Sequence, residues 1–97
     1  MRIDISATSF ELTDAIRDFV HKKFTKLEKH SSHLRHLHLI LKKEQKTFIA
    51  EAVLKFDSHN DIVVETEMQD MYKSIDSTFE RVKHKLDRML DKDHTYR

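Results

Sequence analysis

Residues 36–68, HLHLILKKEQKTFIAEAVLKFDSHNDIVVETEM, contain three stretches in which apolar and polar side chains alternate. A period of two residues is typical of a β-strand that buries one face. We therefore predict strands over residues 36–42, 48–56 and 62–68. The polar connections between them are short enough for hairpin turns. Most of one sheet is thus encoded in this central part of the chain.

Upstream of these strands the sequence predicts one more strand and a helix. Residues 2–6 alternate in the same way and form a short strand. Thr13 is a suitable N-cap, because its hydroxyl can accept a hydrogen bond from a free amide of the first helical turn. Apolar side chains then recur at helical spacing as far as Leu27, so the helix should extend to near Lys29.

Downstream, a longer helix is predicted from its N-cap, Asp70, to about Lys92. Its apolar stripe consists of Met71, Ile75, Phe79, Val82, Leu86, Met89 and Leu90. Each helix has one apolar face, so the economical packing places both on one side of a four-stranded sheet. We expect an α+β fold, a β-α-β-β-β-α two-layer sandwich, as a single domain over residues 1–97 in which 93–97 form a frayed tail.

The composition excludes several classes of protein. The 97 residues include no Gly, Pro, Cys or Trp, and 36% of them are charged. The lack of cysteine excludes a disulfide scaffold and a thiolate metal site, and the lack of glycine excludes the common phosphate-binding loops. The sequence has no apolar run long enough for a membrane span and no signal-peptide pattern at its start, so we expect a cytoplasmic protein.

The small net charge of +1 conceals a segregated distribution of charge. Residues 57–70 are acidic, and the parts on either side are mildly basic. On a helical projection of about 100° per residue, both helices place their basic and acidic side chains on separate flanks. The alternative, a solvated face crossed by ion pairs between neighbouring turns, predicts interleaved signs instead.

We therefore predict a basic groove between the two helices that binds a nucleic-acid backbone. The sequence has no Trp, and most Phe residues fall on core stripes, so stacking of bases on the sheet is poorly supported. Recognition of structured RNA through its shape and its phosphates is favoured. The predicted RNA-binding side chains are Lys22, Lys23, Lys26, Lys29, Arg81, His84, Lys85 and Arg88.

Four segments carry a resemblance to a known family. They are AIRDFV at residues 15–20, KFTKLEK at 23–29, LILKKE at 39–44 and DMYKSID at 70–76. In this order and at these spacings, the chain resembles the ribosome hibernation promoting factor and ribosome-associated inhibitor family over about residues 2–92. The resemblance implies the same β-α-β-β-β-α fold.

The resemblance also implies a function. Family members bind the small ribosomal subunit in the mRNA/tRNA channel, at the A and P sites, and inhibit translation in stationary phase or stress. The implied partners are 16S rRNA and the 70S and 100S ribosomes, with no membrane and no small-molecule substrate, and the free protein is expected to be monomeric. The basic family positions are matched here by Lys23, Lys26, Arg81, His84 and Arg88, although the family more often has Arg where His84 stands.

The branch of the family is predicted from the end of the sequence. The chain stops at Arg97, without the C-terminal dimerising domain of the long form and without the acidic tail of the inhibitor branch. These features favour the short hibernation promoting type, which promotes inactive ribosome dimers.

Metal binding and catalysis are the other chemistries to consider. His30, His33, His36 and His38 invite a metal-binding interpretation, but no carboxylate or thiolate completes an obvious tetrahedral set. We favour a polar sheet face at these histidines and expect no cofactor. No motif for an activated nucleophile occurs, so the sequence predicts no enzyme.

Two other binding functions remain open. A double-stranded RNA binding module has the related order α-β-β-β-α, although the strand at residues 2–6 and the acidic opening of the second helix at Asp70 speak against it. A protein–protein adaptor could use the acidic strand that carries Glu65 and Glu67. Tyr72 is expected to pack at the edge between helix and sheet.

Overall fold

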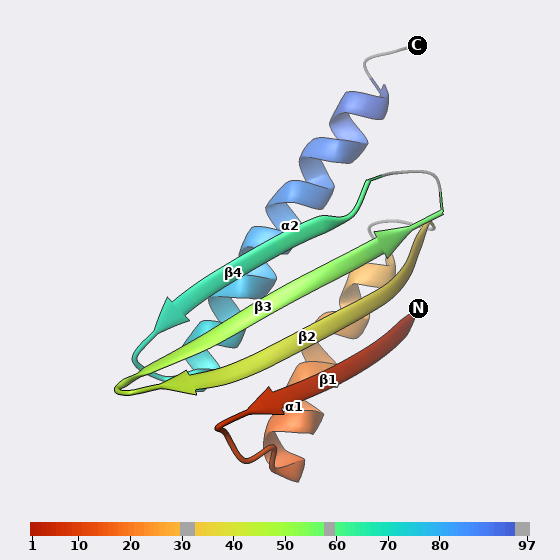
Figure 1. Ribbon diagram of the computed structural model, residues 1–97. Coiled ribbons are helices and arrows are strands. Elements are labelled where there is room, and N and C mark those ends of the chain that lie inside the picture. The colour runs from red at the N-terminus through yellow and green to blue at the C-terminus, as the bar shows by residue number, and fades with distance from the viewer. Residues whose placement is uncertain (30–32, 58–59, 95–97) are drawn as a thin grey trace.

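The computed structural model describes residues 1–29, 33–57 and 60–94, and it confirms the predicted order of elements (Figure 1). The elements are β1 (Arg2–Thr8), α1 (Asp14–Phe24), a 3-10 helix η1 (Thr25–Lys29), β2 (Leu34–Glu44), β3 (Thr47–Phe56), β4 (Ile62–Met68) and α2 (Met71–His94). The strands β1 and β2 are longer than predicted, and α2 continues through His94. Of the predicted frayed tail, residues 95–97 lie outside the described residues.

The first helix differs from the prediction in its last turn. The α-helix ends at Phe24, and the chain continues as the 3-10 helix η1. At this junction the Thr25 hydroxyl donates a hydrogen bond to the carbonyl of His21. A threonine side chain that competes for a helical carbonyl in this way disturbs the regular hydrogen-bond ladder. The basic side chains of Lys26 and Lys29 therefore stand on η1 and not on α1.

The strands form a single sheet with the order β1-β2-β3-β4. The pair β1–β2 is parallel, and the pairs β2–β3 and β3–β4 are antiparallel. A parallel pair needs a long crossover connection, and the segment that contains α1 supplies it. Both helices lie on the same face of the sheet, so the opposite face is left open (Figure 1).

The core lies between this sheet and the helices. It is built from the apolar faces that the sequence predicts, and α2 contributes Met71, Ile75, Phe79, Val82 and Leu86 as buried residues. Phe24 of α1 packs edge-on against Phe79 of α2, with ring centroids 5.4 Å apart. The two helices are thus tied to each other as well as to the sheet.

A buried polar network fixes α2 on the strands. Thr66, Ser74 and Thr78 are each at most 5% exposed. The Thr66 hydroxyl donates to the Ser74 carbonyl at 2.9 Å, and the Ser74 hydroxyl donates to the Thr66 carbonyl at 3.1 Å. Thr78 Oγ1 donates to the carbonyl of Ala50 at 3.2 Å and lies 2.6 Å from Thr66 Oγ1. Burial of these groups is tolerated because each has a partner.

Candidate nucleic-acid interface

The first set of predicted RNA-binding side chains stands on α1 and η1. The helix begins where predicted, since Thr13 Oγ1 accepts a hydrogen bond from the backbone N–H of Ile16 at 3.2 Å. Ile16, Val20 and Phe24 are buried, and this arrangement leaves Lys22 exposed to solvent. We call the exposed side chains of Lys22, Lys26 and Lys29 the α1 basic row.

Lys23 is placed differently from these three lysines. Its side chain is 24% exposed, and its Nζ lies 2.7 Å from the Asp76 carboxylate of α2. The same ammonium group lies 5.5 Å from the ring centroid of Phe19 and 4.9 Å from that of Phe79. A cation at these distances is attracted by the faces of aromatic rings. Lys23 therefore joins α1 to α2, and its charge already has an intramolecular partner.

The second set of predicted side chains lies together on α2. This helix begins at its predicted N-cap, where Asp70 Oδ1 accepts a hydrogen bond from the Lys73 backbone N–H at 3.2 Å. Farther along the helix, four exposed side chains line a hollow of about 320 Å³. We call them the α2 basic flank, and they are Arg81, His84, Lys85 and Arg88. Their spacing of three, one and three residues keeps them on one side of the helix.

A second hollow, of about 150 Å³, adjoins the α2 basic flank. It is lined by Glu80, Lys83, His84 and Asp87, so its charges are mixed. His84 borders both hollows and stands on the ridge between them. Basic side chains are thus grouped in the first hollow, whereas in the second hollow acidic and basic side chains lie together.

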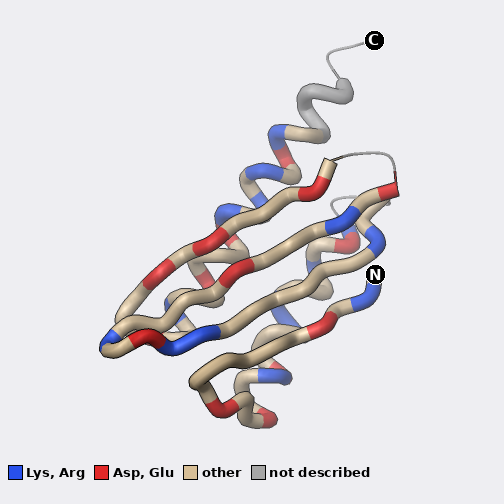
Figure 2. Tube along the Cα trace, in the orientation of Figure 1, with Lys and Arg blue, Asp and Glu red and all other residues tan. Residues whose placement is uncertain are grey.

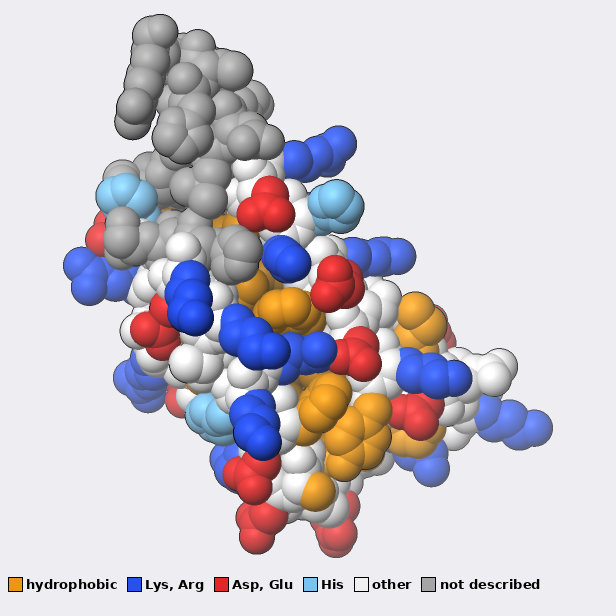
Figure 3. All heavy atoms as spheres, turned by 180° about the vertical axis from the view of Figure 1, so that it is seen from behind, with side chains coloured by type: hydrophobic (Ala, Val, Ile, Leu, Met, Phe, Trp, Pro, Cys, Tyr) orange, Lys and Arg blue, Asp and Glu red, His pale blue; other side chains and the backbone are white. Residues whose placement is uncertain are grey.

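The α2 basic flank does not face α1. The contacts of α2 with α1 are made by Tyr72, Asp76 and Phe79. On a helix of about 100° per residue these positions lie about 180° from the mean direction of Arg81, Lys85 and Arg88. The prediction of one basic groove between the helices is therefore wrong, because the helices present two separate basic surfaces. Figure 3 shows the helix face, where acidic and apolar side chains lie among the groups of lysine and arginine.

Two side chains of α2 add to the predicted picture. Lys83, which was not among the predicted site residues, is half-buried and lines the mixed-charge hollow. Tyr72 packs edge-on against Phe19 with ring centroids 4.9 Å apart, so it lies between the helices and not at the edge between helix and sheet. Helical periodicity alone gives no signal for the position of Tyr72, since it does not tell where the neighbouring helix lies.

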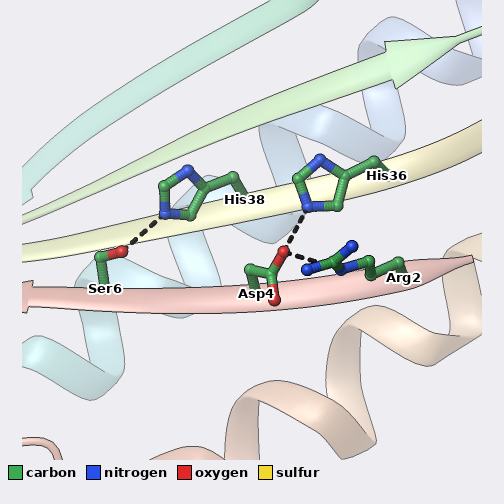
Figure 4. A network of polar contacts seen from close by, with 5 residues as sticks. All are labelled: Arg2, Asp4, Ser6, His36 and His38. Atoms are coloured by element: carbon green, nitrogen blue, oxygen red, sulfur yellow. Dashed lines mark hydrogen bonds and ion pairs between the residues drawn. The ribbon is translucent and has the colours of Figure 1, made fainter.

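His36 and His38, two of the four histidines considered as metal ligands, bind other side chains (Figure 4). His36 Nε2 donates to Asp4 Oδ2 at 2.7 Å, and Arg2 Nε lies 3.1 Å from the same oxygen. His38 Nε2 and Ser6 Oγ share a hydrogen bond of 2.7 Å. The hydrogen bond from His36 lowers the pKa of Asp4 below its ordinary value, and the charge of Arg2 acts in the same direction.

These contacts connect β1 to β2 across the open face of the sheet. His30 lies outside the described residues, and His33 takes part in other interactions. Among the residues that the structure describes, no three His, Cys, Asp or Glu side chains are grouped as metal ligands. The described portion also contains no helix that is both long and apolar enough to cross a membrane.

Comparison with known proteins gives a consistent result. The family described as Sigma 54 modulation protein / S30EA ribosomal protein matches residues 3–94. The chain is 35% identical over 92 residues to the ribosome hibernation promoting factor of Salmonella typhimurium, and the match covers 95% of this chain and 96% of that protein. It is 33% identical to the factor of the same name from Escherichia coli K12, with the same coverage.

Two solved structures have the same architecture. A ribosomal subunit interface protein from Coxiella burnetii gives a TM-score of 0.87 at 21% identity, over 94% of this chain and 99% of that chain. The N-terminal domain of Thermus thermophilus protein Y gives a TM-score of 0.84 at 29% identity, over 92% of this chain and 99% of that chain. These likenesses confirm the predicted two-layer sandwich.

Proposed function

The chain belongs to the Sigma 54 modulation protein / S30EA ribosomal protein family, and on this premise we propose that it is a ribosome hibernation factor. Its relatives from Salmonella typhimurium and Escherichia coli carry the name ribosome hibernation promoting factor. The family is the one that the sequence resemblance predicted. The observation that carries the proposal is the exposed basic surface on each helix, all on one layer of the molecule.

We propose that the helix layer binds 16S rRNA of the small subunit in the mRNA/tRNA channel, at the A and P sites. Lysine and arginine side chains suit this task because they neutralise phosphates and release the counterions condensed on the nucleic acid. Arginine adds bidentate contacts to phosphate oxygens, and Arg81 and Arg88 are both exposed for them. Inhibition of translation then follows from occupation of the channel, without any catalytic step.

Each of the two basic surfaces makes its own part of the contact with rRNA. Because the α1 basic row and the α2 basic flank point in different directions, they contact different rRNA segments. Lys23 holds the two helices at a fixed relative position through Asp76, so the two contacts are made together. A rigid body that engages two segments at once loses little conformational freedom on binding. The protein therefore acts as a preformed plug in the cytoplasm, where ribosomes translate.

The deciding experiment is co-sedimentation of the protein with purified small subunits over a series of salt concentrations. We expect saturable, stoichiometric binding that weakens steeply as salt rises and is lost when tRNA and mRNA fill the channel. No binding at low salt would reject the proposal. Displacement of the protein by free duplex RNA would instead favour a double-stranded RNA binding module.

We further propose that the protein is of the short hibernation promoting type and favours inactive ribosome dimers. Sedimentation of 70S ribosomes on a sucrose gradient, with and without the protein, tests this. A shift of material from 70S to 100S is the expected result. Stoichiometric binding to 70S particles without any 100S peak would assign the chain to a branch that silences single ribosomes.

A further inference from the structure

The open face of the sheet has a character unlike that of the helix layer. On this face, β3 and β4 place two cross-strand pairs next to each other, Val53 with Val63 and Glu51 with Glu65. On β2, Ile40 lies in register with Glu51. Figure 2 shows the acidic positions of β3 and β4 side by side. We call this combination of apolar and acidic side chains the β3–β4 face.

The two glutamates of this face destabilise the free protein. Like charges directly opposite each other on neighbouring strands repel. Within the described ranges, no basic side chain forms an ion pair with Glu51 or Glu65. The nearby Glu67 accepts a hydrogen bond from the Thr47 hydroxyl at 2.6 Å, which leaves its charge in place. The fold thus keeps a repulsive pair that neutral side chains at these positions would remove.

The apolar part of the β3–β4 face is exposed beside these charges. Val63, on the edge strand β4, is 49% exposed. Its cross-strand partner Val53 is half-buried. Burial of such side chains by a partner is favourable in proportion to the apolar area covered. Lys55, on the same face of β3, is already paired with Asp61 at 3.7 Å. Among the described residues, the two glutamates therefore lack a cationic partner, and the exposed half of Val63 lacks an apolar one.

We propose that the β3–β4 face docks a basic protein segment in which lysine or arginine lies next to apolar side chains. Charge complementarity and the exposed Val63 favour a partner of this kind. Opposite charges across an interface steer association and suppress wrong partners. RNA is disfavoured at this face because its phosphates would meet carboxylates. The proposal goes beyond ribosome binding by the helices, since it concerns the other layer of the molecule and a protein partner.

The probe is a short synthetic peptide in which lysine alternates with valine. It is titrated into the full-length protein labelled with ¹⁵N at low salt, and backbone amide shifts are recorded. We expect shifts confined to β3 and β4, with weaker binding as salt is added. The experiment contains no ribosomes, so its outcome is independent of the proposed function. Absence of shifts on β3 and β4 at low salt would overturn the proposal.

Two pairs of substitutions separate docking from general attraction. Glu51→Gln with Glu65→Gln is expected to weaken peptide binding about fivefold and to raise the melting temperature by about 1–4 °C. Glu11→Gln with Glu80→Gln removes the same charge from exposed positions elsewhere and is expected to leave peptide binding within about twofold. Equal losses in the two pairs would overturn the proposal, because attraction would then follow net charge alone.

Other occupants give distinct results in the same experiment. If β3 and β4 amides shift with protein concentration in the absence of peptide, the face binds a second copy of the chain, and the proposal of a basic segment fails. Shifts of these amides with a short RNA duplex would also contradict it. Val63→Thr keeps a β-branched side chain in the strand. An unchanged affinity for the peptide in this variant would contradict the proposed apolar contact at Val63.

Discussion

Lys23 is the residue whose environment differs most from that of its neighbours in the predicted site. We expect Lys23→Ala to lower the free energy of unfolding by about 1–2 kcal/mol, since it removes two cation–π contacts and a partly exposed ion pair. Lys22→Ala, an equal change of charge at an exposed position, is expected to stay within about 0.5 kcal/mol. Chemical denaturation of both variants measures the difference. Similar losses in the two variants would show that Lys23 does not fasten the helices.

Asp4 makes stability depend on pH at the junction of β1 and β2. Its pKa is lowered by the hydrogen bond from His36, so the folded state binds a proton less readily there than the unfolded state. The resulting stabilisation is present above the ordinary aspartate pKa of 3.8 and is lost as the pH falls through the lower folded-state value. Asp4→Asn should therefore be less stable than the natural protein at pH 7.

The difference in the free energy of unfolding between Asp4→Asn and the natural protein should shrink as the pH falls below the pKa that Asp4 has in the folded state. Urea unfolding at a series of pH values provides the measurement, and because the Asp4 side chain is 43% exposed the effect is expected to be small. Asp14→Asn, a matched change at an exposed residue, serves as the control. If the difference in unfolding free energy stays unchanged in acid, the hydrogen bond from His36 to the ionised Asp4 carboxylate is not its cause.

At the scale of elements, the position of α2 depends on a polar network within the apolar interface. Thr78→Val keeps the shape of the side chain but removes the hydroxyl that donates to Ala50 and contacts Thr66. We expect a loss of about 1–3 kcal/mol in the free energy of unfolding, because buried partners are left unsatisfied. Thr8→Val at an exposed strand position should change it by no more than about 0.5 kcal/mol. Equal unfolding midpoints for the two variants would contradict a structural role for the network.

The network also shows what helix patterning misses. Ser74 and Thr78 lie on the same side of α2 as the apolar stripe, yet they were not predicted as core residues. Serine and threonine are mostly exposed in proteins, so composition assigns them to the surface. They are buried here because Thr66 and a β3 carbonyl supply hydrogen-bond partners from other elements.

At the scale of the whole molecule, the two basic surfaces can be tested as separate binding sites. Replacement of Lys22, Lys26 and Lys29 by Ala, and separately of Arg81, Lys85 and Arg88, should each reduce the salt dependence of subunit binding by about three units of slope. The effects on binding free energy should add when the sets are combined, because sites without shared partners act independently. Filter binding over a salt series gives the slopes.

The control replaces three other lysines by Ala and removes the same total charge. They are Lys43 of β2, Lys46 of the turn between β2 and β3, and Lys55 of β3. This variant should bind nearly as the natural protein does, because these side chains stand on strands or their turn and not on the helix layer. If all three triple variants lose the same affinity, net charge and not the placement of the lysines and arginines governs binding. That result would reject both basic surfaces as sites.

The sequence by itself determined the four strands, the two α-helices, their order and the family, but not the 3-10 helix at Thr25–Lys29. The strands within residues 36–68, the caps Thr13 and Asp70 and the apolar stripe of α2 from Met71 to Leu86 appear in the structure as predicted. These signals are readable because they act between residues two to four positions apart, where backbone geometry alone relates the side chains. The likeness over residues 3–94 confirms the family that the sequence motifs indicated.

Only the tertiary structure decided how the charged flanks are arranged. Local periodicity places Arg81, Lys85 and Arg88 on one side of α2, but it does not state which side meets α1. That rotation is set by contacts between residues far apart in the chain, Phe19 with Tyr72 and Phe24 with Phe79. The sequence thus determined which side chains are basic and exposed, and helix packing decided that they form two surfaces instead of one groove.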